Sequence, residues 1–199
     1  MSEQTIQNEL YSIPVTILDK YTCLSLGATT VKDLVDSGKL IGVSPSVNHG
    51  KKPDVLIIDK DKRVVVFLEF KQPSEFNSDK KIKSAINQEI EVAKKVGAKI
   101  FVATDGNKFI WINPKTGNRI KDETGNDVCK SITPKLEEKK LAEFIGRVAL
   151  DISENNDVLV KITDSDPTDL AMKIGGILKN INFTTPKDSL YTFVELFLF

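Results

Sequence analysis

The chain has 199 residues, a formal net charge of zero, 40% hydrophobic residues and 28% charged residues. This is the composition of an ordinary soluble protein with one sizeable core, or with a domain of about 130 residues plus an appendage. A signal peptide and a membrane-spanning apolar run are both absent, so we expect a cytoplasmic location, where Cys23 and Cys129 are not expected to form a disulfide.

The first quarter of the chain is predicted to be mainly helical. Apolar residues at helical spacing predict one or two helices over residues 3–22. The sequence Thr30-Val-Lys-Asp33 resembles a capping box and predicts a short helix that Gly38 ends. A short strand is predicted over residues 40–43, and a loop over residues 44–52 follows it.

A β-hairpin is predicted next. Two runs rich in β-branched residues, Val55–Ile58 and Val64–Leu68, flank the polar cluster Asp59–Arg63, which is the usual sequence signal for two strands and a turn. With Asp61 and Lys62 at the tip, the numbers of directly paired residues sum to 123.

The middle of the chain predicts an α/β fold with a mixed sheet flanked by helices. A helix is predicted over residues 81–96, and a second hairpin is predicted from strands at 100–104 and 109–112. Trp111 in that hairpin is expected in the core rather than as a platform for base stacking. Turn residues predict a small β excursion over residues 119–128.

The composition shifts near Pro134. Beyond it the sequence predicts an amphipathic helix over residues 135–152 and another over residues 166–178. We therefore expect a first domain over residues 1–133 and a helical connector over residues 134–199.

Two carboxylates and one amine are predicted to meet at one end of the first hairpin. The sum of 123 places Asp54 opposite Glu69, with Cβ atoms roughly 5 Å apart, and alternation puts Lys71 on the same face as Glu69. Two bare carboxylates at that distance repel by about 3 kcal/mol at an effective dielectric near 20, so the pair needs a counter-charge.

A divalent cation is the natural counter-charge for such a pair. Oxygen ligands that are few in number suit Mg²⁺ better than zinc, and His49 is the only histidine. A cation held in this way could clamp a phosphodiester and activate a bound water, while Lys71 orients that water or stabilises charge on phosphorus. The chemistry favoured is hydrolysis of a phosphodiester bond.

The pattern Pro53-Asp54, fourteen residues, then Glu69-Phe70-Lys71 resembles the signature of the PD-(D/E)XK nuclease superfamily. The resemblance implies a restriction-endonuclease-like mixed β-sheet core flanked by helices. It also implies a nuclease that depends on Mg²⁺, for which Mn²⁺ can substitute. Asp54 and Glu69 would bind the ion, the carbonyl of Phe70 would assist, and Lys71 would sit by the attacking water.

The segment after Lys71 resembles the nuclease domains of type I restriction subunits. The strand, Asp-Gly turn and strand over residues 99–112 carry this resemblance. Such proteins often have a Gln-x-x-x-Tyr motif on the helix after the lysine; here Gln88 stands at the glutamine position, but Val92 replaces the tyrosine. A helix before the hairpin often supplies a further acidic residue, for which Glu9 is the candidate.

The last ten residues are similar to the opening of the helical domain that precedes type I-like adenine methyltransferases. We therefore expect the nuclease end of a larger restriction-modification polypeptide. Its partners would be double-stranded DNA and the methyltransferase and specificity regions of a longer chain or complex. The alternative is a complete small protein whose core this apolar segment covers.

Three functions are compatible with the predicted hairpin. The leading hypothesis is a Mg²⁺-dependent DNA endonuclease, supported by a local excess of lysine, seven against four acidic residues, between Lys71 and Lys99. The alternative keeps the fold as a catalytically degenerate module that binds nucleic acid or acts as a scaffold. In the third, Asp54 and Glu69 form an ordinary surface salt bridge with Lys71.

Overall fold

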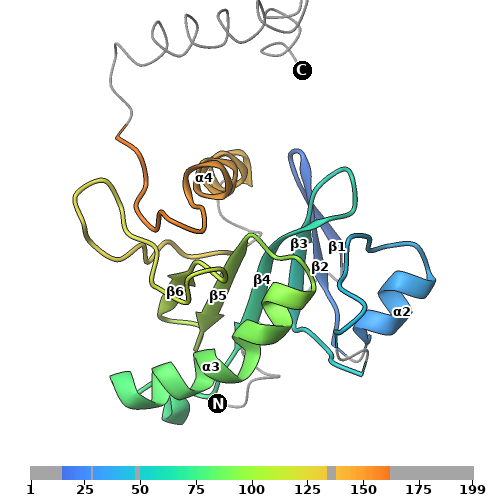
Figure 1. The fold of residues 1–199 in the computed structure, drawn as a ribbon, viewed down its shortest axis with the longest axis horizontal. Helices are drawn as coiled ribbons and strands as arrows, with labels where there is room; N and C mark the ends of the chain where they lie inside the picture. The colour runs from blue at the N-terminus through green and yellow to red at the C-terminus, as the bar shows by residue number, and fades with distance from the viewer. Residues whose placement is uncertain (1–14, 28, 48–49, 134–137, 162–199) are drawn as a thin grey trace, which may run out of the picture. The chain divides into compact units, whose positions relative to one another are not determined.

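A six-stranded mixed β-sheet forms the centre of the computed structural model, which describes residues 15–27, 29–47, 50–133 and 138–161 (Figure 1). The strands lie in chain order across the sheet: β1 (Val15–Leu18), β2 (Tyr21–Ser25), β3 (Val55–Ile58), β4 (Val64–Phe70), β5 (Ile100–Thr104) and β6 (Phe109–Ile112). Of these strands β4 and β5 pair in parallel, and the other neighbours are antiparallel. The predicted α/β fold with a mixed sheet is confirmed.

The parallel pair follows from the connection between β4 and β5. After β4 the chain makes a short 3₁₀ turn, Pro73–Glu75, and then forms the longest described helix, α3 (Asp79–Lys95). A helix between two strands returns the chain to the starting end of the sheet, so the next strand enters in the same direction. Gly97, with a positive φ of 79°, follows the helix where the sequence predicts its end.

Each face of the sheet is covered by helices, because alternate strand residues bury their side chains on opposite sides (Figure 1). Helix α4 (Glu138–Asp151) covers the face that carries Ile57, Leu68 and Val102. Helices α2 (Val31–Asp36) and α3 cover the opposite face. That second face carries Leu56, Phe67, Phe101 and Ala103.

The register of the central hairpin agrees with the prediction at the end where the acidic residues lie. Val55 pairs with Leu68, Leu56 with Phe67 and Ile57 with Val66, so each pair sums to 123. Nearer the tip a β-bulge shifts the register by one residue. The extra residue is Val65 on β4, between the partners of Ile57 and Ile58.

The helix predicted over residues 3–22 is wrong for its second half, where the chain forms strands β1 and β2. The two strands pair antiparallel with Leu18 opposite Tyr21, so Asp19 and Lys20 form a two-residue turn. Asp19 has the positive φ, 54°, that such turns favour. Because the apolar residues of this stretch also include β-branched ones, pairing of β1 with β2 and of β2 with β3 outweighs helical spacing. The remainder, residues 3–14, lies outside the described residues.

Two predictions for short segments on either side of α2 have opposite outcomes. The capping box is present: Thr30 caps α2 by accepting from the Asp33 backbone, and the Asp33 carboxylate accepts from the Thr30 backbone. The strand predicted over residues 40–43 is wrong. This segment is irregular: Gly42 has a positive φ of 75°, and the backbone nitrogen of Ile41 donates to the Lys62 carbonyl at the hairpin tip.

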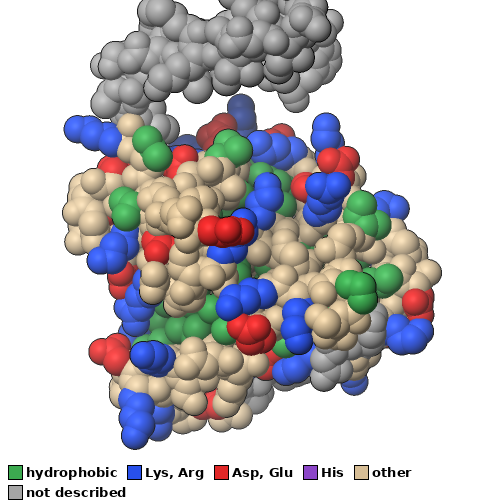
Figure 2. Space-filling view, viewed as in Figure 1, with side chains coloured by type: hydrophobic (Ala, Val, Ile, Leu, Met, Phe, Trp, Pro, Cys, Tyr) green, Lys and Arg blue, Asp and Glu red, His purple; other side chains and the backbone are tan. Residues whose placement is uncertain are grey.

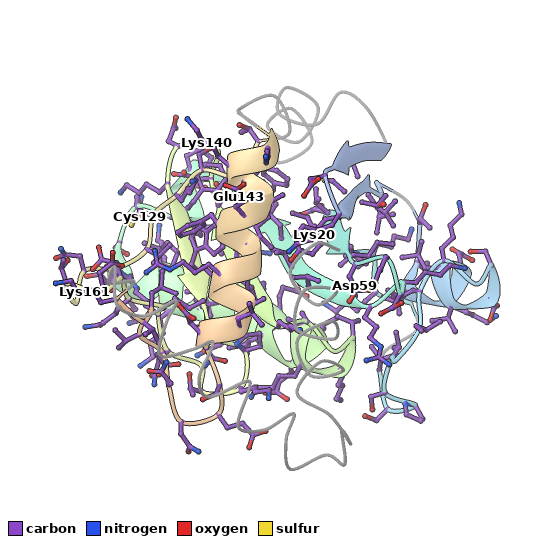
Figure 3. The ribbon with its side chains drawn as sticks, turned by 90° about the horizontal axis from the view of Figure 1, so that it is seen from above. Lys20, Asp59, Cys129, Lys140, Glu143 and Lys161 are labelled. Atoms are coloured by element: carbon purple, nitrogen blue, oxygen red, sulfur yellow. The ribbon has the colours of Figure 1, made fainter. Side chains whose placement is uncertain are left out.

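Helix α4 belongs to the same compact unit as the sheet, which runs to Val160, so the boundary predicted at residue 133 falls inside this unit. Figure 3 shows α4 lying over the sheet, and the inner side of this helix is buried there. The buried residues of α4 are Leu141, Ala142, Ile145 and Val148. An amphipathic pattern signals that one side of a helix is buried, and here the burying surface is the sheet itself. The predicted connector beyond residue 161 lies outside the described residues.

Replacing Ile145 with alanine is expected to lower the free energy of unfolding by about 2–5 kcal/mol, because the side chain is completely buried between α4 and the sheet. The control is Leu150→Ala on the same helix. Leu150 is 83% exposed, so its loss should change stability by less than about 0.5 kcal/mol. Urea unfolding of the full chain measures both; equal effects would contradict the packing of α4.

Candidate active site

Asp54 lies directly before β3, next to the end of β4. Its Oδ2 atom accepts a hydrogen bond of 2.8 Å from the backbone nitrogen of Phe70. Its own carbonyl accepts from the backbone nitrogen of Leu26, at the end of β2. The first bond orients the carboxylate, and the second anchors the Asp54 backbone where β2 and β4 end and β3 begins.

Glu69 and Lys71 project from the same face of the chain, as alternation requires. The Lys71 Nζ atom lies 3.2 Å from Glu69 Oε1, and the two side chains are only 10% and 13% exposed. The Lys71 backbone nitrogen donates to the Thr104 carbonyl, which extends the parallel ladder past the end of β4. This ion pair is therefore largely withdrawn from water, unlike an ordinary surface pair.

Burial raises the pKa of both carboxyls. For Asp54, desolvation is opposed by the hydrogen bond from Phe70 and by the charge of Lys71. For Glu69, desolvation and the charge of Asp54 raise the pKa to about 8, in spite of Lys71. The charge of Lys71 therefore does not offset the effect of burial on the pKa of the two carboxyl groups.

These shifts predict a pH-dependent stability for the metal-free protein. Because the pKa of Glu69 in the folded chain, about 8, exceeds its ordinary value of 4.5, the folded state binds more protons than the unfolded state between these two pH values. The contribution of Glu69 to the free energy of unfolding must then fall as pH rises through this window. The raised pKa of Asp54 acts in the same direction.

Glu69→Gln cannot ionise and should lose this dependence. Near pH 5 we expect this variant to match the wild-type protein in stability. Near pH 8 the variant should be more stable, because the wild-type protein must then bury the ionised carboxylate of Glu69. Urea unfolding in the presence of a chelator at the two pH values gives the comparison. A stability difference that does not change with pH would contradict the buried, coupled pair.

Sequence reasoning missed Glu89, which lies on the buried stripe of α3. Its side chain is 12% exposed and its charge contributes to the raised pKa of both Asp54 and Glu69. Glu89 is three residues after Ile86 and four before Ala93, both buried on the face of the helix toward the sheet. An acidic residue in an apolar stripe is the sequence signal that could have identified it.

The other predicted site residues lie elsewhere. Gln88 is exposed on α3, one residue from Glu89 but on a different side of the helix. Glu9 and His49 lie outside the described residues. Trp111 is in the core, as predicted: it is 1% exposed, and its Nε1 atom donates to the Lys130 carbonyl.

The donor set has limited capacity for a metal ion. No group of three or more His, Cys, Asp or Glu side chains in the described residues is arranged to hold one. Asp54 and Glu69 are hard oxygen donors with too little positive charge nearby, which is the environment that a hard divalent cation favours. Such a cation would complete its shell with backbone, water or phosphate oxygens.

Comparisons with known proteins do not identify a family for this chain. No protein-family model and no curated protein matches the chain. One solved structure, the type IIG restriction endonuclease BpuSI, matches over 74% of this chain with 18% identity and a TM-score of 0.28. The match spans 18% of that enzyme's chain. At this TM-score the likeness carries no weight, and the fold assignment stands on the sheet itself. None of the described helices is long and apolar enough to cross a membrane.

Proposed function

We propose that this chain is a metal-dependent DNA endonuclease domain that hydrolyses phosphodiester bonds. The observation that carries the proposal is the convergence of Asp54, Glu69 and Lys71 at one end of the central hairpin. The lysine and the glutamate are mostly buried there, which an ordinary surface salt bridge does not require. The resemblance of these residues to the PD-(D/E)XK signature supports the same function.

Asp54 and Glu69 would hold Mg²⁺, or Mn²⁺ in its place, with the carbonyl of Phe70 as a further oxygen donor. Bound there, the ion would neutralise the two carboxylates, lower the pKa of a water molecule and contact a phosphate oxygen. The hydrogen bond from the Phe70 backbone orients Asp54 before any ion binds. Preorganisation of this kind reduces the cost of assembling the site.

Lys71 would act on the reacting phosphodiester. It stays fixed because its backbone bonds to β5 and its ammonium group contacts Glu69. With a cation held by the carboxylates, the Lys71 ammonium group would be available to orient the attacking water or to stabilise charge that develops on the phosphate oxygens. Its low exposure strengthens that interaction, because little water competes for the charge.

The partners proposed for this domain follow from the sequence resemblances. Double-stranded DNA would be the substrate. The methyltransferase and specificity regions of a restriction-modification polypeptide would supply target recognition, since the chain has no recognisable base-reading motif. Lys and Arg side chains lie among Asp and Glu on the visible face, with no continuous basic surface (Figure 2).

One observation favours a second candidate, a degenerate module that binds nucleic acid without cleaving it. Val92 stands at the position of the tyrosine in the Gln-x-x-x-Tyr motif, and it is buried on α3 at 8% exposure. An apolar side chain there supplies no hydrogen bond to a substrate. Gln88, the other residue of that motif, faces solvent.

Incubation of the full chain with supercoiled plasmid in Mg²⁺, Mn²⁺ or chelator separates the two candidates. The endonuclease proposal expects nicked or linear plasmid only where metal is present. Salt-sensitive DNA binding without cleavage in either metal would favour the degenerate module. Cleavage that persists in chelator would contradict a metal-dependent site.

A further inference from the structure

A second ion pair borders the candidate site, between Lys51 and Glu89. The Lys51 Nζ atom lies 2.9 Å from one carboxylate oxygen of Glu89 and 3.1 Å from the other. The two residues come from different elements: Lys51 from the loop before β3, and Glu89 from the middle of α3. The glutamate is 12% exposed, whereas the lysine is 37% exposed and can reach solvent.

The pair is close enough to act on the site electrostatically. Glu89 raises the pKa of both Asp54 and Glu69 through its charge. Lys51 precedes Asp54 by three residues, and its backbone carbonyl accepts a hydrogen bond from Val31 at the start of α2. The loop backbone is therefore anchored, while the long side chain spans the distance to α3.

Each of the two ion pairs joins one carboxylate to one ammonium group, and Asp54 adds a further carboxyl group beside them. Among the described residues, the carboxyl groups of Asp54, Glu69 and Glu89 lie near the two ammonium groups of Lys51 and Lys71. A DNA phosphate close to the site would compete for Lys51, the more exposed of the two lysines. If Lys51 turned to the phosphate, Glu89 would lose its partner while remaining buried, and its charge would then attract a cation to the neighbouring carboxylates.

We propose that Lys51 changes partners when DNA binds: it leaves Glu89 for a backbone phosphate, and the released Glu89 strengthens cation binding between Asp54 and Glu69. The inference rests on the proposed function and extends it. Glu89 acts through charge or through a bound water, since it does not complete a three-ligand cluster with the other two acids. By linkage, DNA and cation must then each increase the affinity for the other.

DNA binding in chelator tests the exchange without any cation. Glu89→Gln frees Lys51 and is expected to bind a short duplex about 3- to 10-fold more tightly than the unchanged protein. Lys51→Met should bind more weakly. The double variant should match Lys51→Met, because the benefit of removing Glu89 requires the lysine. A simple loss of negative charge would instead strengthen binding in both backgrounds, and that result would overturn the exchange.

Glu91→Gln is the matched control on the same helix. Glu91 pairs with Lys94 at 2.7 Å, and the two side chains are 62% and 38% exposed. This substitution removes one negative charge and frees one lysine, but the pair is not buried at the site. Its effect on DNA affinity is expected to be less than about 2-fold. An effect as large as that of Glu89→Gln would also contradict the proposal.

Titration with Ca²⁺, with and without the duplex, tests the second part of the proposal, that the released Glu89 strengthens cation binding. The unchanged protein should bind Ca²⁺ more tightly when DNA is present, and Glu89→Gln should lose most of that increase. Equal increases in both proteins would refute the role of Glu89. Plasmid cleavage is measured beside these titrations: if metal-dependent cleavage persists without the coupling, the exchange fails and the endonuclease stands. If neither the wild-type protein nor any variant binds or cleaves DNA, the partner exchange and the proposed endonuclease function both fail.

Discussion

Lys71→Ala is expected to lower the rate of plasmid cleavage by about 10²- to 10³-fold, the usual cost of removing one preorganised group that stabilises developing charge. The side chain is 10% exposed and in contact with Glu69, so its ammonium group is already held beside the carboxyl groups. Cleavage rates in saturating Mg²⁺, at equal concentrations of both proteins, measure the effect.

The comparison requires that the variant folds and binds DNA. Removing Lys71 leaves Glu69 without its ion-pair partner, but protonation at its raised pKa relieves part of the cost near neutral pH. Circular dichroism and DNA affinity should therefore stay close to those of the unchanged protein. Lys115→Ala, at a 55% exposed lysine after β6, is the control and should cleave normally. Equal cleavage by Lys71→Ala would exclude Lys71 from the reaction.

Asp54→Asn is expected to abolish cleavage and to weaken Mg²⁺ binding by at least about 10-fold, the smallest usual cost of disturbing a metal site. The amide oxygen of asparagine can still accept the hydrogen bond from Phe70, so the fold should be kept. What is lost is the negative charge and the stronger oxygen donor. Calorimetric titration with Mg²⁺ near pH 8 measures the change in affinity.

Asp54→Ala separates the two roles of this residue. Alanine removes the charge and also removes the hydrogen bond that the Asp54 carboxylate accepts from the Phe70 nitrogen, and losing such a bond to a buried group costs about 1–3 kcal/mol of stability. We expect both variants to lose metal, and only the alanine variant to unfold at lower urea concentration. Mg²⁺ binding by Asp54→Asn equal to that of the unchanged protein would refute the assignment of Asp54 as a ligand.

The hairpin and its register could be predicted from sequence, because they depend on local features. Strand runs, a polar turn and a fixed period of two residues place Asp54 beside Glu69 and put Lys71 on the same face, whatever the rest of the chain does. The bulge near the tip changed the pairing only beyond Ile57, on the side away from the carboxylates.

Features that depend on contacts between distant segments could not be predicted in the same way. Glu89 became part of the site only because α3 packs on the face of the sheet that carries Glu69. Strand β2 forms because it pairs with β3, and β1 because it pairs with β2; helical spacing in residues 3–22 does not reveal these interactions. The boundary expected at residue 133 differs from the observed unit for the same reason, since Ile145 and its neighbours on α4 pack against the sheet.

The central claim is that Asp54 and Glu69 share one divalent cation. A crystal of the full chain grown with a short duplex and Mn²⁺ tests it directly, because the anomalous signal of manganese locates the ion. We expect a peak about 2.0–2.3 Å from oxygens of both carboxylates, with a phosphate or water oxygen in the same shell. Manganese bound elsewhere, with both carboxylates free of metal beside bound DNA, would contradict it.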